Sequence, residues 1–215
     1  MAMPRPEPYV WVTWITRLLA GEANCEWALW FRAHYKYEKL PPETDFAVRN
    51  ARHAELVRNR IMELEADGFT VYQEDQNTFS LPGRVVTLGG RPDIIAVKGE
   101  LGLVVDCKTG VKKNSDHFQI LTYMLVLPLV NAVCKGRSLS GEITYSDHAV
   151  RLSPGDLDSE VRRLITTVLR RAGDVEPSRR VPGYSECRFC DISKADCADR
   201  VEAAPIAGSS DHDLF

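Results

Sequence analysis

Two apolar runs that each carry one aspartate lie close together near the middle of the chain. The first is GGRPDIIAV at residues 89–97, and the second is LGLVVDCKTG at residues 101–110. Short runs rich in Val and Ile, separated by a tight connection, are typical of two paired β-strands. Because alternate side chains of a strand point to the same face, we expect Asp106 and Lys108 on one face and Cys107 on the other. The fold must therefore include a sheet whose strand ends carry charged groups.

The charged groups of these two strands form a set with definite chemistry. Asp93 and Asp106 can together hold a divalent metal such as Mg²⁺ or Mn²⁺ through oxygen ligands. Lys108 beside them can orient a water molecule or stabilise developing negative charge. This combination suits hydrolysis of a phosphodiester. The alternative is a hairpin whose ends carry ordinary polar residues, and these three residues alone leave both interpretations open.

A histidine and a glutamine–tyrosine pair flank the two strands in the sequence. His53, within an expected helix, can supply a nitrogen ligand to a divalent metal, and Glu55 is a nearby carboxylate that can compete for this role. Gln119 and Tyr123 are four residues apart, so they share one helical face, where an amide and a phenol can reach a phosphate or position a water. Each residue alone has an ordinary alternative, as a boundary histidine or as a core aromatic with a solvated hydroxyl.

Hydrophobic periodicity divides the rest of the chain into helices and strands. Helices are expected within 11–37, interrupted near Gly21, and at 43–67, 116–132 and 154–172; strands are expected at 69–75, 78–81, 84–88, 93–97 and 101–108, with a hairpin at 141–152. The short connections between the strands favour hairpins and an antiparallel or mixed sheet. This order of elements predicts an α/β fold in which helices flank a central mixed sheet.

Four of the six cysteines form a candidate metal site. Cys187, Cys190 and Cys197 follow a C-x2-C-x6-C spacing, and such a trio needs a fourth ligand if it holds a metal. Cys25, in an aromatic N-terminal segment, is the candidate, whereas Cys134 at the end of an apolar helix is expected to be a buried thiol. Four thiolates suit either Zn²⁺ or an iron–sulfur cluster. A zinc ribbon usually supplies two close pairs, so this spacing favours a cluster.

The overall composition restricts the partners and the compartment of the chain. Its 215 residues fit one domain, and a hydrophobic content of 44% is normal for a packed globular protein. No apolar run has the length of a membrane span and the N-terminus does not have the pattern of a secretory signal, so we expect a cytoplasmic location. The formal net charge is −3, so a nucleic acid would need a local basic patch or a metal; Lys112 and Lys113 can contribute to one.

In their order along the chain, these residues resemble the active-site motifs of the PD-(D/E)XK nuclease superfamily. More narrowly, the chain looks like the CRISPR-associated and RecB-like exonucleases that carry a four-cysteine iron–sulfur cluster, and VTWITRLLAGEANCEWALWFRAHY resembles the segment that bears their first cysteine. The resemblance extends from about Thr13 to Cys197. It departs at Asp106, where these relatives often have glutamate, and at Glu26, where they usually have a proline after the first cysteine.

The resemblance implies a role for each residue of the set. The metal ligands would be His53, Asp93 and Asp106, with the carbonyl of Cys107 as a candidate fourth ligand. Lys108 would be the catalytic lysine, and Gln119 and Tyr123 would match the QxxxY helix of these enzymes. Cys25, Cys187, Cys190 and Cys197 would hold a [4Fe–4S] cluster that joins the two ends of the fold.

The resemblance also implies a domain organisation and a function. Residues 1–200 would form a single RecB-like nuclease domain with a restriction-endonuclease-like core, in which 11–40 and 180–200 make the cluster-bearing helical part. The implied activity is a Mg²⁺- or Mn²⁺-dependent exonuclease acting on single-stranded or end-frayed DNA in repair, recombination or CRISPR adaptation. The alternatives are a non-catalytic DNA-binding or adaptor module that retained the fold, and a sequence-specific endonuclease.

The C-terminal segment has a different composition from the rest of the chain. Residues 201–215 contain few large apolar side chains and are expected to form a flexible tail. The tail ends in DHDLF at 211–215, which resembles the short peptides by which bacterial DNA enzymes bind the sliding clamp. The glutamine usual in such peptides is absent, and a tail without a partner is the favoured alternative.

Overall fold

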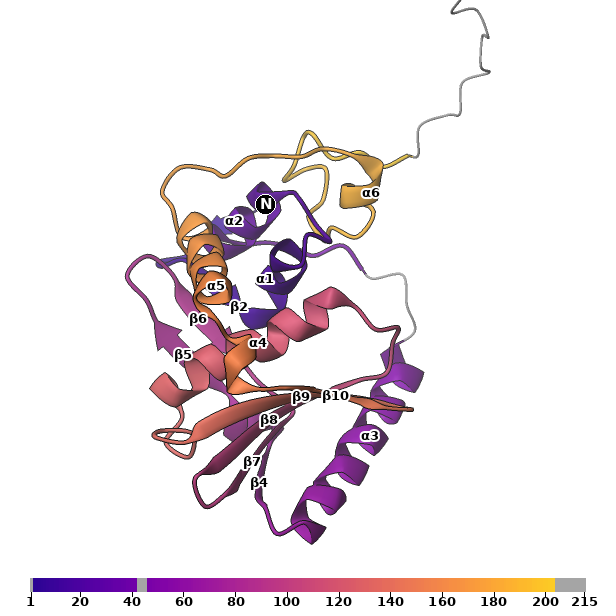
Figure 1. Cartoon of the computed structure of the whole chain (residues 1–215). Helices are drawn as coiled ribbons and strands as arrows, with labels where there is room; N and C mark the ends of the chain where they lie inside the picture. The colour runs from indigo at the N-terminus through magenta and orange to yellow at the C-terminus, as the bar shows by residue number, and fades with distance from the viewer. Residues whose placement is uncertain (1, 42–45, 204–215) are drawn as a thin grey trace, which may run out of the picture.

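A computed structural model describes residues 2–41 and 46–203 of the chain (Figure 1). The helices are α1 (Val12–Leu19), α2 (Glu26–His34), α3 (Phe46–Ala66), α4 (Asn114–Val130), α5 (Ser159–Ala172) and α6 (Tyr184–Cys187), with 3-10 turns η1 (Glu74–Asn77) and η2 (Pro154–Asp156). The strands are β1 (Met3–Pro4), β2 (Tyr9–Trp11), β3 (Tyr35–Lys36), β4 (Thr70–Gln73), β5 (Phe79–Pro82), β6 (Thr87–Gly90), β7 (Ile94–Lys98), β8 (Leu101–Lys108), β9 (Ser138–Tyr145) and β10 (Ala149–Leu152).

The two aspartate-bearing runs lie side by side in a five-stranded sheet of order β10-β9-β8-β7-β4. β7 and β8 are antiparallel neighbours, with Ile94 opposite Val105. β8 and β9 are parallel, and α4 makes the crossover between them. The remaining neighbours in this sheet are antiparallel. The expected α/β class, with helices around a central mixed sheet, is confirmed.

Helices cover both faces of the five-stranded sheet (Figure 1). α3 packs on one face through a small apolar cluster that includes Leu64, Val105 and Cys107. α4, α1 and α5 lie on the other face, over a larger core that includes Val104 and Ile120. The alternation along β8 therefore sends Cys107 towards α3 and leaves Asp106 and Lys108 on the face covered by α4.

Two expected strands leave the central sheet and pair elsewhere. β5 and β6 form a three-stranded sheet with β2, of order β2-β6-β5, in which β2 and β6 are parallel. The expected hairpin pairing is present for β5 with β6 and for β7 with β8, whereas β4 pairs with β7 across this insertion. Trp11, which helical periodicity placed in the first helix, belongs to β2 instead. Its pairing partner Gly89 is far away in sequence, so local periodicity could not identify the strand.

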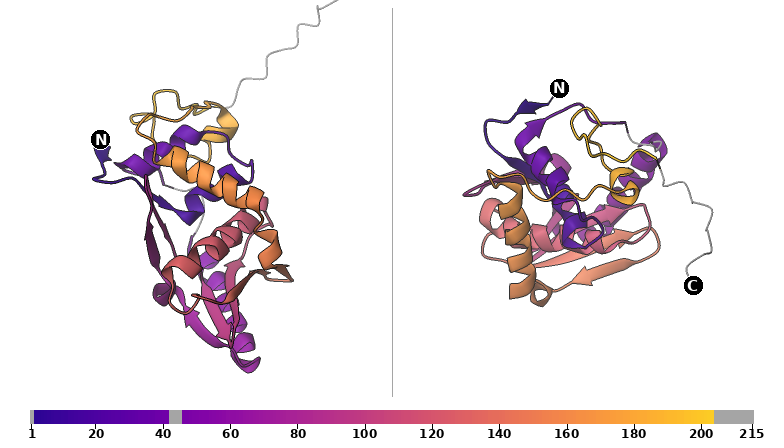
Figure 2. Two further views of the ribbon diagram at one scale, coloured as in Figure 1. Left: turned by 60° about the vertical axis from the view of Figure 1, so that its left-hand side comes forward. Right: turned by 90° about the horizontal axis from the view of Figure 1, so that it is seen from above.

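The N-terminal helices lie against the C-terminal segment (Figure 2). The chain breaks between α1 and α2 as expected, and Gly21 there has a φ of 68°, which favours glycine. Trp27 N donates to the carbonyl of Arg179 at 3.0 Å. Arg32 donates to Asp191 Oδ1 from Nε at 2.9 Å and from Nη2 at 2.8 Å. Residues distant in sequence thus form one layer above the core.

The described residues bear on two further expectations. None of the helices within 2–41 and 46–203 combines the length and the apolar character needed to cross a membrane. The clamp-like peptide at 211–215 lies outside the described residues, as does most of the expected tail.

Candidate active site

The carboxylate of Asp106 is at the centre of the candidate site. It extends from β8 towards α4 and is buried, with 3% of the residue exposed. Its Oδ1 accepts a hydrogen bond from Gln119 Nε2 at 2.6 Å. Its Oδ2 lies 2.6 Å from Lys108 Nζ and forms an ion pair with it. This oxygen is therefore compensated by the charge of the ammonium, and it is also a hard oxygen donor of the kind that divalent cations bind.

Lys108 and Gln119 connect β8 to α4 around that carboxylate. Lys108 Nζ donates to Gln119 Oε1 at 2.9 Å, so the amide contacts both charged groups. Gln119 Nε2 also lies 3.5 Å from Tyr123 Oη, one turn further along α4. The expected shared face of Gln119 and Tyr123 is thus present, and it is turned towards β8.

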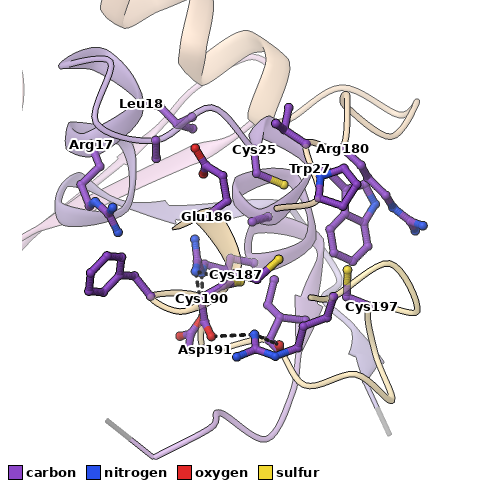
Figure 3. Close-up of a pocket in the computed structure, with 18 of the residues that line it drawn as sticks. Arg17, Leu18, Cys25, Trp27, Arg180, Glu186, Cys187, Cys190, Asp191 and Cys197 are labelled. Atoms are coloured by element: carbon purple, nitrogen blue, oxygen red, sulfur yellow. Dashed lines mark hydrogen bonds and ion pairs between the residues drawn. The ribbon is translucent and has the colours of Figure 1, made fainter. Parts of the chain in front are cut away.

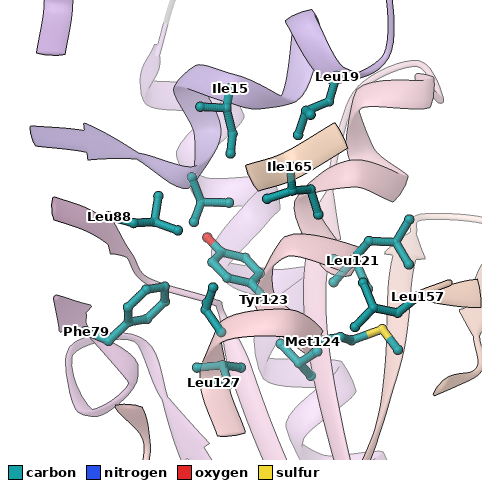
Figure 4. Packing of buried hydrophobic residues seen from close by; sticks show 14 of the residues in the cluster. Ile15, Leu19, Phe79, Leu88, Leu121, Tyr123, Met124, Leu127, Leu157 and Ile165 are labelled. Atoms are coloured by element: carbon teal, nitrogen blue, oxygen red, sulfur yellow. The ribbon is translucent and has the colours of Figure 1, made fainter. Parts of the chain in front are cut away.

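Tyr123 joins the site to the main hydrophobic core. Its ring is almost fully buried and stands edge-on to Phe79 at a centroid distance of 6.2 Å, among apolar side chains from several elements (Figure 4). A Cβ atom at Gly90 would lie 2.6 Å from Phe79 Cζ and 2.9 Å from Tyr123 Cε1. The absence of a side chain at Gly90, three residues before Asp93, therefore makes room for the two rings. The core fixes the hydroxyl end of Tyr123 beside Gln119.

Asp93 and His53 form a second pair beside the first. Asp93 Oδ2 accepts a hydrogen bond from Cys107 N at 2.7 Å, which ties it to β8. His53 Nε2, from α3, lies 3.1 Å from the same oxygen. This hydrogen bond raises the pKa of His53, with burial opposing the rise. Glu55 is exposed, and of the two candidates on α3 it is His53 that contacts the site.

Burial and charge act in opposite directions on the central ion pair. Burial raises the pKa of Asp106 to about 6, Lys108 opposes this rise and the charge of Asp93 adds to it. For Lys108, burial favours the neutral amine, but the Asp106 carboxylate outweighs it and the pKa is raised. The attraction between the two groups thus keeps the lysine protonated while burial dominates at the aspartate.

The carboxylates of Asp93 and Asp106 fit a divalent cation chemically, although the side chains around them do not form a complete metal-binding site. In the described part of the chain, no three histidine, cysteine, aspartate or glutamate side chains converge closely enough to enclose a metal ion. Asp93 is engaged with His53, while Asp106 is engaged with Lys108 and Gln119. The two carboxylates are nevertheless the hard oxygen donors that Mg²⁺ and Mn²⁺ prefer.

The structure brings the four selected cysteines to one cavity. Cys25, Cys187, Cys190 and Cys197 all line a space of about 280 Å³ between the N-terminal helices and the C-terminal segment (Figure 3). Arg32 Nη2 lies 3.7 Å from Cys190 Sγ. The remaining two cysteines are elsewhere: Cys107 packs under α3, and Cys134 is fully buried in the main core. The thiol donor set fits Zn²⁺ or an iron–sulfur cluster.

Two buried carboxylates near the site were missed by sequence reasoning. Glu142, on β9, is fully buried and accepts two hydrogen bonds from Arg60 on α3, at 2.7 and 2.9 Å. Asp116, in the first turn of α4, accepts a hydrogen bond from Tyr145 Oη at 2.8 Å. A lone glutamate inside an apolar strand was the available signal for the first, because such a charge is rarely buried without a partner.

Comparisons with known proteins relate the chain to one superfamily. A sequence model of the PD-(D/E)XK nuclease superfamily matches residues 13–195. No protein with a curated description matches the chain. Among solved structures, the crystal structure of SSO0001 is similar, with 17% sequence identity and a TM-score of 0.48, over 87% of this chain and 85% of that one. PD-(D/E)XK proteins are generally nucleases that use divalent metals such as Mg²⁺ or Mn²⁺. Because the superfamily match spans most of the sequence, the chain belongs to the PD-(D/E)XK nuclease superfamily.

Proposed function

We propose that this protein is a metal-dependent DNase, an exonuclease acting on single-stranded or end-frayed DNA in repair, recombination or CRISPR adaptation. The observation that supports a catalytic role most is the buried Asp106 carboxylate with its adjacent Lys108. Burying an ion pair costs desolvation free energy, and a pure binding module has no need of one. Buried charged groups with perturbed pKa values are typical of catalytic sites.

The metal ligands in this proposal are His53, Asp93 and Asp106, with the carbonyl of Cys107 as a fourth. The chemistry that a bound divalent cation supplies is polarisation of the scissile phosphate and activation of a water molecule. Asp93 is fixed in place by the backbone N–H of Cys107 and by His53. Its carboxylate is therefore oriented before any ligand arrives.

Lys108 supplies positive charge at a fixed position. An ammonium group has three N–H donors; here Gln119 accepts one, and Asp106 lies beside the ammonium as its ion-pair partner. A remaining donor can reach the attacking water or a phosphate oxygen, where it would stabilise the negative charge that develops in the transition state. Gln119 acts as a positioning residue, because it contacts both members of the ion pair, and Tyr123 supports its amide.

A [4Fe–4S] cluster held by Cys25, Cys187, Cys190 and Cys197 is the second part of the proposal. The support is that all four line one cavity, together with a spacing that suits a cluster better than a zinc ribbon. The cluster would join the ends of a single nuclease domain at 1–200, whose parts 11–40 and 180–200 surround the cavity. A cytoplasmic location, where thiols stay reduced, agrees with six free cysteines.

The decisive experiment is digestion of labelled DNA by anaerobically purified protein. We expect cleavage of linear single strands with added Mg²⁺ or Mn²⁺, none after chelation, and no cleavage of circular single strands. Cleavage of circles would replace the exonuclease by an endonuclease. Binding without cleavage under all metal conditions would favour the adaptor module.

Elemental analysis of the same preparation tests the cluster. Iron and inorganic sulfide in equal amounts are expected, together with visible absorption. Stoichiometric zinc without iron would replace the cluster by a zinc site. Binding of a labelled 206–215 peptide to a bacterial sliding clamp, compared with a peptide lacking the side chains of Leu214 and Phe215, tests the remaining partner predicted from the sequence.

A further inference from the structure

An aromatic side chain stands on the surface beside the cysteine cavity. Phe189 lies between Cys187 and Cys190 and is 58% exposed, whereas phenylalanine is usually buried. Two guanidinium groups lie over its ring in cation–π contact, with Arg17 Cζ at 5.3 Å and Arg188 Cζ at 4.4 Å from the centroid. The ring belongs to none of the three apolar clusters of the fold. The apolar core therefore does not account for an aromatic residue here, and most of the residue stays open to solvent.

Hydrogen bonds connect the residue before the 187–190 loop to the start of α4 through the segment between α1 and α2. Asn24 donates to Glu186 Oε1 from its backbone N at 3.0 Å and from Nδ2 at 2.9 Å. In the same segment, Glu22 Oε1 accepts a hydrogen bond from Ser115 N at 3.0 Å, in the first turn of α4. The active-site glutamine follows one turn later, about 6 Å along the helix axis. The exposed ring and the candidate site thus border one continuous stretch of structure.

Uncompensated positive charge accompanies the exposed ring. Within the part of the chain that the structure describes, Arg17, Arg188, Lys112 and Lys113 take part in no salt bridge. The two arginines lie beside the ring, and the two lysines are exposed between β8 and α4. Unpaired positive groups and an exposed aromatic ring match the two chemical features of a nucleic-acid strand, its phosphates and its bases.

We propose that Phe189 is a stacking platform for a base of single-stranded DNA, with Arg17 and Arg188 holding the adjoining phosphates. This inference rests on the proposed function and adds a substrate-binding residue outside the metal site. In a duplex, both faces of each base are already stacked, so the ring can accept only an unpaired base. Phe189 would therefore select the single-stranded form of the substrate and direct it towards the active site.

The test compares variants at this position in an Asp93→Ala background, which is expected to abolish cleavage while DNA binding is retained. Fluorescence anisotropy measures the Kd for a labelled oligothymidine of about 20 nucleotides and for a blunt duplex. Loss of one stacked base should raise the Kd for the single strand about tenfold in Phe189→Ala. Phe189→Tyr should bind like the background, and Phe189→Leu, which is apolar but has no π face, should bind like Phe189→Ala. The matched control is Leu129→Ala, an exposed apolar residue at the opposite end of α4.

Several outcomes would overturn the platform. They are a Phe189→Ala affinity within twofold of the background, recovery of binding by leucine, or equal weakening for the duplex and the single strand. If Phe189→Ala fails to fold, the Kd values of Phe189→Tyr and Phe189→Leu for the single strand still show whether an aromatic ring is required. Failure of the platform leaves metal-dependent cleavage by the wild-type chain unaffected. Conversely, Phe189-dependent binding in a chain that never cleaves DNA would reject the nuclease proposal and retain the platform.

Discussion

Asp106 is held where burial and charge oppose each other. Its carboxylate is almost completely buried, and the nearby ammonium of Lys108 compensates its charge. Removing either partner leaves the other charge buried without compensation, which costs folding free energy. Any loss of activity in a variant of this pair must therefore be measured alongside its thermal stability.

The first prediction concerns the two carboxylates and the lysine. Asp93→Ala and Asp106→Ala should abolish cleavage because each removes a metal ligand, while DNA binding is largely retained. Lys108→Ala should reduce the cleavage rate about 10²-fold or more, because it removes a charge that stabilises the transition state. The measurement is single-turnover cleavage in metal-depleted buffer with added Mg²⁺. Asp75→Ala is the matched control, since Asp75 is exposed. Full activity in either site-aspartate variant would reject the assignment.

His34 provides a prediction on pH and stability away from the active site. It is half-buried against Trp30, at a ring-centroid distance of 4.7 Å, and burial lowers its pKa. The unfolded chain therefore binds a proton more readily than the folded one, and stability should fall as the pH drops below about 6.5. His34→Phe keeps the stacked ring and should flatten this part of the profile, measured by denaturant unfolding between pH 7.5 and 5. His148→Gln, at an exposed histidine, is the control. An unchanged slope in His34→Phe would show that another group is responsible.

At the level of elements, hydrophobic patterns predicted most helices and strands but not all of their partners. α4 was expected at 116–132 and occupies Asn114–Val130, because its apolar periodicity is a local property. The pairing of β2 with β6 joins residues far apart in the chain, and local patterns hold no information on it. The same limit applies to the site. The shared face of Gln119 and Tyr123 was predictable, whereas the contact of Gln119 with Asp106 depends on how α4 sits on β8.

The packing of α4 on the central sheet gives a further prediction. A Cβ atom at Gly141 on β9 would overlap Ile120 Cγ2 and lie 2.9 Å from Met124 Sδ, both on α4. Gly141→Ala should therefore destabilise the protein by about 1–3 kcal/mol through overpacking, measured by urea unfolding. Gly110→Ala is the control, because a Cβ there meets no atom within 4 Å. A double variant with Ile120→Ala should show favourable coupling. Additive effects would mean that the contact is not the cause.

At the scale of the whole molecule, the cysteine cavity unites the two ends of the chain. If all four thiols share one metal centre, Cys25→Ser should lower the melting temperature as much as Cys187→Ser, although Cys25 is far from the other three in sequence. The control is Cys134→Ala, because a serine at that fully buried position would add an unpaired hydroxyl. Anaerobic thermal melts with metal analysis provide the measurement. Parent-like stability and metal content in Cys25→Ser would exclude it as the fourth ligand.

The packing of the N-terminal helices on the C-terminal segment also has a consequence during synthesis. Asn24 and Glu186 are hydrogen-bonded across a separation of 162 residues. At a translation rate of about 5–20 residues per second, the ribosome needs roughly 10–30 s to make the partner of the first helices. During that interval the aromatic surface of Trp27, Trp30 and Phe31 has no cover from Ile192. The nascent chain therefore leaves part of this surface open to chaperones until this segment emerges, and a chain truncated before residue 187 would lack Ile192 to cover it.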